Sequence, residues 1–432
     1  MLLVYTYKVT PRLTYIMRHI FTKMLLIDIS ITTKVEDFIA HKGPKITYTK
    51  QPLQSEFFVK SHELLFEQGI SDVEINVQDW NGVPCFFPTT EKCALPFDIF
   101  AASFYLLSRY EEYLPHVKDE HGRFPASESL AYQNRFLEFP VVDIWVLKLK
   151  KALQERFPEI EFPKRTYQQT SIMDIASAFA YKKKGFIRTL GGTLIDLTSL
   201  KLGRVLDRYL VLLGFRKDPL DFFDRLTAFH KRHKVSAIFF FLMANYSTYD
   251  KNISVINPTF RSLVKSVADY SIVSLMASYN SFNDIAELKK ERRRLIDFIN
   301  RPVKRARQRF NRLNIPDTYR LLVDAGFNED YTMGYTKEVG FRAGTCTPFY
   351  FYDISFEEQI PIKINSFCIQ YTALYKYRSV RKAQEKIAEI SQRVRAVNGE
   401  FNIVFSNEIL NMHERSSWQD LYINYIKSNN EK

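Results

Sequence analysis

Short apolar segments alternate with amphipathic segments of helical period beyond residue 165. Val235–Ala244 (VSAIFFFLMA) and Ser271–Tyr279 (SIVSLMASY) are predicted strands, and the first is apolar enough to be buried on both faces. Between Ser281 and Asn300 the apolar residues recur instead at the spacing of a helix. Strands that alternate with helices in this way indicate parallel strands joined by crossover helices, hence an α/β barrel or a doubly wound sheet.

The same alternation continues toward the end of the chain. We expect helices over 316–325 and 380–397 and strands over 330–335 and 401–405. The first half is less regular. There we expect strands over 24–31 and 72–77 and helices over 96–114 and 141–157.

The segment Phe157–Arg165 contains two prolines and few helix signals, so we place a domain boundary there. This divides the chain into residues 1–160, an N-terminal α/β domain of unknown function, and residues 165–432. A chain of 432 residues is long for one domain and sufficient for two.

The chain is basic, with 61 Lys and Arg against 48 Asp and Glu. A net charge of +13 suits anionic partners such as nucleic acid, an anionic membrane surface or an acidic polysaccharide. The excess is concentrated in Lys289–Arg294 and Arg301–Arg312, which we interpret as a solvated helix face. Few aromatic residues lie within these runs, so stacking on single-stranded nucleic acid is not indicated.

The cysteines and the N-terminus favour a cytoplasmic location. The four cysteines are scattered and form no C-x-x-C pair, which is typical of reduced thiols. The N-terminal segment is interrupted by Lys8, Arg12 and Arg18 and lacks the apolar core of a signal peptide. We also find no apolar run long enough to span a bilayer.

Several motifs in the second half occur in an order that resembles a known family. They are DIASAFAYKKKG (174–185), KDPLDFFD (217–224), MASY (276–279), RQRF (307–310), PDTYRLL (316–322), DYTMGY (330–335) and GFRAGTCTPFYFYD (340–353). Together they resemble a bacterial branch of the polysaccharide deacetylases, the carbohydrate esterases of the NodB homology type. FYLLSRYEEYLP (104–115) and DEHGRF (119–124) resemble the uncharacterised domain that precedes the barrel in this branch.

This resemblance implies a distorted (β/α) barrel over residues 165–432 and a metal-dependent hydrolase. In the family, one Asp and two His hold a divalent metal such as zinc, which polarises the acetyl carbonyl. A second Asp deprotonates the attacking water, an Arg orients that Asp, and a late His protonates the leaving group. By resemblance Asp174 is the base and Arg342 its orienting residue, so we expect the two to pair.

The chain departs from the family at the residues that hold the metal. The Asp ligand position contains Ala176, and the two His positions contain Met276 and Arg309. Alanine has no donor atom, and the thioether of methionine is a poor ligand for zinc. Arginine stays cationic, and at about 4 Å and an effective dielectric of about 20 it would oppose a dication by roughly 8 kcal/mol.

We therefore predict a deacetylase-like protein that holds no metal or other cofactor and does not hydrolyse its glycan. It would belong to a surface-polysaccharide pathway and act by binding a glycan or a partner enzyme. The acid position contains Ser406, and Gln370-Tyr371 stands where this branch has Met-Asp. By resemblance, the substrate-binding residues would be Tyr279, Tyr335 and Phe349.

Two other functions remain open at this point. One is an active deacetylase with a relocated metal site, for which His230 and His233 are weak candidates, while His413 is a weak candidate for a substitute acid. On their basic loop we interpret His230 and His233 as solvated. The other is a basic scaffold that binds nucleic acid or membrane. A dense set of charges in 109–123 is interpreted as a surface ion network.

Overall fold

A computed structural model describes residues 1–410 and 417–430 and confirms the α/β class. The first part of the chain forms a parallel sheet in the order β2-β1-β3-β4. Its strands are β1 (Leu2–Thr6), β2 (Ile29–Thr32), β3 (Lys45–Thr49) and β4 (Phe57–Lys60). A short antiparallel pair, β5 (Gln78–Asp79) and β6 (Pro84–Cys85), follows.

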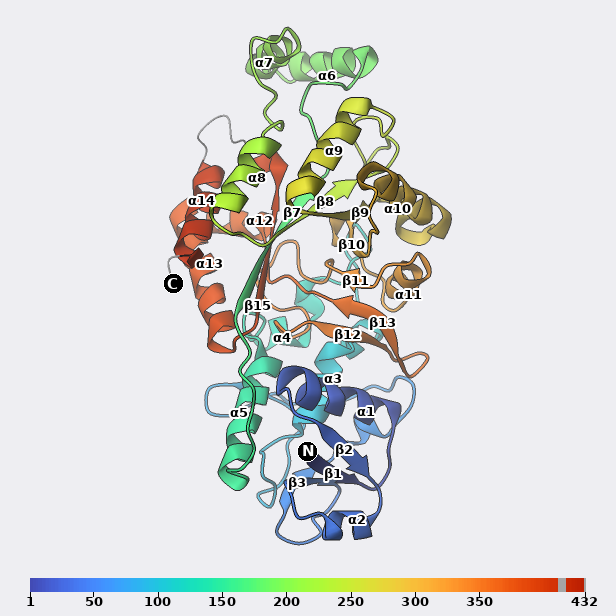
Figure 1. Cartoon of the computed structure of the whole chain (residues 1–432), viewed down its shortest axis with the longest axis vertical. Helices are drawn as coiled ribbons and strands as arrows, with labels where there is room; N and C mark the ends of the chain where they lie inside the picture. Colours follow the sequence, from blue (N-terminus) through green and yellow to red (C-terminus); the bar gives the residue numbers. More distant parts are fainter. Residues whose placement is uncertain (411–416, 431–432) are drawn as a thin grey trace.

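The helices of this first part are short except for the last one. They are α1 (Pro11–Met17), α2 (Val35–Ala40), α3 (Ile99–Leu107), α4 (Leu130–Gln133) and α5 (Val141–Arg156). The chain continues from α1 as a π-helical segment over Arg18–Met24. Figure 1 shows this part at one end of an elongated molecule, with α5 along its side. α5 begins beside the second part of the chain, where the Val142 backbone donates to the Gly344 carbonyl, and ends beside the first sheet, where Arg156 donates to the Ser55 carbonyl.

The second sheet has nine strands in the order β12-β13-β11-β10-β9-β8-β7-β15-β14. All neighbours are parallel except β12 and β13. The strands are β7 (Gln168–Ile175), β8 (Ala237–Leu242), β9 (Ile272–Ala277), β10 (Arg305–Gln308), β11 (Glu329–Asp330), β12 (Phe349–Asp353), β13 (Glu358–Ile364), β14 (Ile369–Gln370) and β15 (Glu400–Ser406).

Helices connect these strands along the chain. They are α6 (Phe186–Thr198), α7 (Leu202–Leu212), α8 (Phe223–Arg232), α9 (Pro258–Tyr270), α10 (Ile285–Ile299), α11 (Asp317–Asp324), α12 (Tyr371–Leu374), α13 (Val380–Ala396) and α14 (Ser417–Asn430). In the described part of the chain, no helix is both long enough and apolar enough to cross a bilayer.

The strands follow chain order from β7 through β11 to β13, and β15 returns beside β7. Within residues 1–410 and 417–430 no strand pairing joins the two edge strands, β12 and β14, so the sheet is open between them. Successive residues of the central strands point to opposite faces, and both faces are buried. Phe239 and Phe241 of β8 join the main core, whereas Phe240 lies in a separate small cluster with Ala176 and Met276.

Most predicted elements of the second half are present, but parts of the first half differ. Residues 72–77 form no strand, and the expected strand over 24–31 is helical up to Met24, with β2 beginning only at Ile29. The helix expected over 96–114 ends at Leu107. Two residues later Arg109 adopts a left-handed backbone with φ of 56°, which directs its side chain into the interior.

Buried ion pairs join the two halves of the chain. Arg109 donates to Glu112 at 2.7 Å and Glu111 at 2.6 Å, and it also contacts the carbonyl of Arg342. Arg342 in turn donates to both carboxylate oxygens of Glu112, at 2.9 and 2.6 Å. The surface ion network predicted for this segment was therefore wrong for Arg109, Glu111 and Glu112, which are almost fully buried between the two halves. Glu120 of the same segment does lie at the surface.

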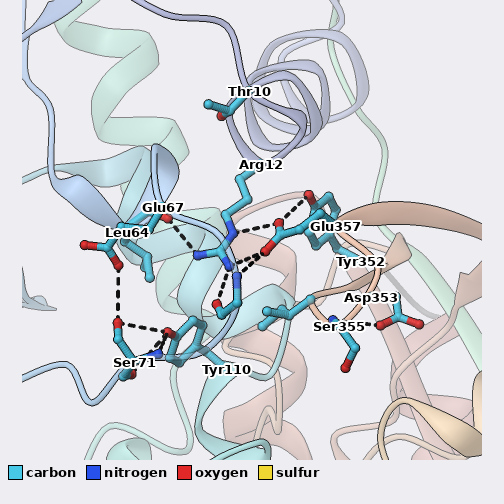
Figure 2. Close-up of polar contacts among 12 residues, drawn as sticks. Thr10, Arg12, Leu64, Glu67, Ser71, Tyr110, Tyr352, Asp353, Ser355 and Glu357 are labelled. Atoms are coloured by element: carbon cyan, nitrogen blue, oxygen red, sulfur yellow. Dashed lines mark hydrogen bonds and ion pairs between the residues drawn. The ribbon is translucent and has the colours of Figure 1, made fainter.

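A second joint involves the loop that connects β12 and β13 (Figure 2). Arg12 of α1 is fully buried and donates to Glu357 at 2.9 Å and to the Leu64 carbonyl at 2.9 Å. Glu357 also accepts from Tyr352 at 3.0 Å and from the Gly69 backbone at 2.8 Å. Since a buried guanidinium needs a nearby carboxylate, α1 can pack here only against this loop.

Glu112→Gln should lower the free energy of unfolding by about 3–5 kcal/mol, because Arg109 and Arg342 would stay buried without their shared carboxylate. Urea unfolding followed by circular dichroism measures this. Glu155→Gln is the matched control: Glu155 pairs only loosely with Lys151 on the exposed side of α5, at 3.9 Å, so its loss should be below about 1 kcal/mol. Equal losses of stability in the two variants would contradict the role of Glu112 in joining the two halves.

The stability that Glu112 contributes depends on pH, because its carboxylate is paired with Arg109 and Arg342. Burial raises the pKa of Glu112, but the charges of Arg342 and Arg109 outweigh burial and lower it from 4.5 to about 2. A carboxyl group whose pKa is lower in the folded state stabilises the fold above its ordinary pKa. The difference in stability between the wild type and Glu112→Gln should therefore shrink as the pH falls from about 4.5 toward 2.

Candidate functional site

The carboxyl ends of β7, β9 and β10 bring the three replaced ligand positions together. Parallel strands end at a common edge of their sheet, which is where α/β proteins place their sites. Ala176 follows β7, Met276 lies near the end of β9, and Arg309 follows β10. Ala176 and Met276 belong to one buried apolar cluster, and Arg309 Nη1 lies 3.9 Å from the Met276 sulfur.

Asp174 pairs with Arg307 and not with Arg342, so the pairing expected from the resemblance was wrong. Arg307 Nε lies 2.8 Å from Asp174 Oδ1, and the Arg307 side chain is only 1% exposed. The same guanidinium also donates to the Tyr331 carbonyl at 2.5 Å and to Asn311 at 2.7 Å. Arg342 cannot take this place because Glu112 and the joint between the two halves hold its side chain.

Arg309 pairs with a buried carboxylate that the sequence does not single out. Its Nε lies 3.4 Å from Oδ1 of Asp250, whose side chain is 1% exposed, and its Nη2 donates to the Tyr249 carbonyl at 3.3 Å. Burial raises the pKa of Asp250, and the charge of Arg309 partly offsets this. Asp250 also accepts from the Tyr279 backbone at 3.1 Å, which ties the loop after β8 to the end of β9.

This set of side chains does not fit a divalent metal. The third ligand position already contains a cation, and Asp174 is occupied by a second guanidinium. Within the described residues, no three His, Cys, Asp or Glu side chains come together in a way that could hold an ion. An Arg–Asp pair thus lies at a position that the resemblance assigns to an ion and its ligands.

Ser406 and Gln370 lie beside the Asp174–Arg307 pair. Ser406 is in register with Asp174 across β15 and β7, and its hydroxyl caps a short helical turn by accepting from the Glu408 backbone at 3.2 Å. Gln370 accepts from Asn311, which also binds Arg307. A serine hydroxyl does not titrate near neutral pH, so Ser406 cannot replace the family's His as a proton donor of comparable strength.

The three expected substrate-binding residues are dispersed. Tyr279 is half-buried beside the candidate site. Tyr335 is buried, with its ring 5.5 Å from the Arg342 guanidinium, and lines a cavity of about 70 Å³ between the two halves. A cavity of that size holds water and no sugar. Phe349 of β12 is 1% exposed and packs near His19, so it belongs to the core.

Aromatic rings form a platform next to Arg309, which we define as Tyr249, Tyr279, Phe310 and His121. Tyr249 and Tyr279 stack with their centroids 4.0 Å apart, and Phe310 meets both edge-on at 6.0 and 5.8 Å. His121 comes from the N-terminal part and lies 4.8 Å from Phe310. Tyr249 is 43% exposed, so the platform presents one open ring to solvent.

Several residues of the site were not predicted from the sequence. Asp250 and Tyr249 follow β8 without a motif, whereas Arg307 and Asn311 lay within the basic run 301–312, which was interpreted as a solvated helix face. That interpretation was wrong for Arg307, because this run forms β10 and the turn after it. His413 lies outside the described residues.

The interpretation of H-x-x-H as a solvated pair on a loop was wrong for His230. This residue lies in α8 and is 3% exposed. Its Nε2 lies 2.6 Å from the Tyr422 hydroxyl, and burial lowers its pKa to about 4. The ring is therefore neutral at physiological pH and packs between α8 and α14.

Comparison with protein families gives one match, in the first part of the chain. Residues 2–158 match a model described as a family of unknown function, DUF7033. No curated protein matches the chain.

Three solved structures resemble the chain at low identity. A protein from Mycobacterium smegmatis assigned as a polysaccharide deacetylase is 12% identical over 63% of this chain and 86% of its own, with a TM-score of 0.40. A polysaccharide deacetylase from Bacillus cereus is 13% identical over 62% and 89%, with a TM-score of 0.29. A GH138 enzyme targeting pectin rhamnogalacturonan II is 9% identical over 93% and 46%, with a TM-score of 0.26.

Asp174→Asn should lower the free energy of unfolding by about 2 kcal/mol, because the amide keeps an acceptor oxygen for Arg307 but loses the charge. Thermal and urea unfolding measure the change. Asp269→Asn is the matched control, since Asp269 and Arg301 are both more than half exposed and lie 3.8 Å apart; its effect should stay below about 1 kcal/mol. If Asp174→Asn leaves the free energy of unfolding unchanged, the Asp174–Arg307 pair does not stabilise the fold and the prediction is wrong.

Proposed function

We propose that this chain is a polysaccharide deacetylase-like protein that binds a glycan without hydrolysing it. One observation carries the proposal: the Arg309 guanidinium lies against the Met276 sulfur and pairs with buried Asp250, at the position of the family's third metal ligand. A fixed cation there opposes a second cation, and the pair satisfies the carboxylate that an ion would otherwise attract.

The motif order and the strand order support the deacetylase-like part of this proposal. The motifs from Asp174 to Tyr335 occur along strands β7 to β11, which follow chain order across the sheet, and β15 returns to β7 as in a barrel. On this view the open side between the edge strands β12 and β14 is the distortion of a (β/α) barrel. The replaced positions meet at the carboxyl edge, where the family's site would lie.

The aromatic platform supports the binding part. Sugar rings present apolar C–H faces that pack on aromatic rings, while their hydroxyls need polar partners nearby. Tyr249 offers an open ring, and Arg309 and Asp174 are partly exposed beside it, with side-chain exposures of 21% and 16%. An acetylated oligosaccharide of a surface-polysaccharide pathway is the proposed ligand, and a cytoplasmic location stays a prediction.

Metal analysis after dialysis, with an acetate-release assay on N-acetylated oligosaccharides, tests the loss of hydrolysis. We expect neither bound zinc nor acetate from the wild type. The triple variant Ala176→Asp, Met276→His and Arg309→His should gain zinc, because it restores the donors and leaves Asp250 unpaired. The control carries Asn, Gln and Gln at the same positions and should bind none. Zinc and turnover in the wild type would refute the proposal.

Calorimetry with a panel of acetylated oligosaccharides tests binding. Tyr249→Ala should weaken the affinity of a bound sugar about tenfold, the contribution of one aromatic contact. Tyr7→Ala is the matched control, because Tyr7 is 44% exposed, as Tyr249 is 43%, but lies just after β1 in the N-terminal half. No affinity for any member of the panel, or equal affinities of the two variants, would count against the platform.

A further inference from the structure

The hairpin formed by α6 and α7 is built with its polar side chains inside. Asp196 and Arg208 are almost fully buried and form an ion pair between the two helices. Arg208 also donates to the Thr189 carbonyl at 2.9 Å and to the hydroxyl of buried Thr193 at 3.3 Å. The side of each helix that faces its partner is thus held by polar contacts.

The outer side of the hairpin is apolar. More than a third of the large apolar side chains exposed in the described chain lie between residues 186 and 215. They are Phe186, Ile187, Leu190, Leu194, Ile195, Leu197, Leu200, Leu202, Leu206, Tyr209, Leu212, Leu213 and Phe215. Monomeric soluble proteins rarely expose a continuous surface of this kind, so it marks a surface that is covered in use.

The hairpin also stands apart from the rest of the fold. The two helices pack mainly against each other, at the end of the molecule opposite the N-terminal sheet and beyond α8 and α9 (Figure 1). One anchor at the base is Arg188, which donates to the Asn252 carbonyl at 3.0 Å and lies 3.9 Å from the Tyr246 ring centroid. The apolar side is therefore open to a large flat partner.

The charge of this segment identifies the partner. Residues 182–217 contain nine Lys and Arg and two Asp, which gives +7 of the chain's +13. Both aspartates already pair with arginines inside the segment, Asp196 with Arg208 and Asp207 with Arg216. Two copies of such a hairpin would repel each other. An anionic lipid surface instead attracts the lysines through its headgroups and accepts the apolar side chains at the boundary of its acyl chains.

We propose that the α6–α7 hairpin, residues 182–217, docks in the plane of an anionic phospholipid membrane. A helix of 13 residues is about 20 Å long, too short to span a hydrocarbon core of about 30 Å, so the helices lie in the interface. The loop that receives Arg188 also carries Asp250. The membrane would thus hold the hairpin near the carboxyl edge of the sheet.

Co-sedimentation of the full chain with vesicles tests this. We expect the protein to sediment with phosphatidylcholine vesicles that contain phosphatidylglycerol and to remain in solution with phosphatidylcholine alone. Ile187→Asn with Leu194→Asn should weaken binding at least about tenfold, because each side chain loses its transfer out of water. Ile39→Asn, at a residue 71% exposed on α2, should bind like the wild type.

Two further experiments test whether basic residues contribute to vesicle binding and whether the hairpin enters the lipid. Lys201→Gln and Arg204→Gln should each weaken binding about fivefold, and Lys382→Gln on α13 should not. Ile187→Trp should show a blue shift of tryptophan emission when anionic vesicles are added, whereas Ile39→Trp should not, because only the first ring would enter the lipid.

Three results would overturn the proposal. They are no sedimentation with anionic vesicles, hairpin variants that bind like the wild type, or a dimer in sedimentation velocity that Ile187→Asn abolishes while vesicle binding is absent. The last result would mean that a second copy covers this surface.

Discussion

Buried guanidinium groups must be paired, and this requirement determines how the two halves of the chain fit together. Glu112 of the first half is shared by Arg109 and by Arg342 of the second, and Arg12 reaches Glu357 across the other side of the contact. An unpaired charge at either place would cost several kcal/mol. The two sheets also share one continuous apolar core, and the charge pairs lie at its margin where the two halves meet.

The same requirement explains the candidate site. Arg307 and Arg309 both lie where β10 ends, and each needs a carboxylate within reach. Asp174 and Asp250 supply them. Two ion pairs therefore lie at the positions that the resemblance assigns to an ion and its ligands. The proposed glycan-binding function uses the open ring of Tyr249 together with the polar groups beside it.

The α6–α7 hairpin reverses the usual distribution of polarity, and here too the charges explain the structure. Arg208 and Asp196 satisfy each other between the helices, so the inner side needs no apolar cover. The outer side then carries the apolar residues of the amphipathic pattern. A single sheet edge thus has a polar, aromatic site and, near it, an apolar and basic surface. The two differ in chemistry and suit different partners.

Elements with strong periodicity could be predicted from the sequence, while side-chain partners could not. The strands β8, β9 and β15 and the helices α5, α10 and α13 follow from local patterns, because burial on one or both faces leaves a regular signature. The segment 72–77 alternates like a strand but forms none, since a strand also needs a neighbour. The helix before Arg109 ends early because a buried network, and not a local signal, determines the backbone there.

By itself the sequence determined the α/β class, the alternation of strands and helices in parts of the chain beyond residue 165, and the side-chain chemistry present at 176, 276 and 309, because periodicity and side-chain chemistry are local properties. Only the tertiary structure decided that Asp174 pairs with Arg307, that Arg342 belongs to the joint, and that Asp250 neutralises Arg309. Those pairs connect residues far apart in the chain, and the partner of a buried charge depends on which strand ends meet in space.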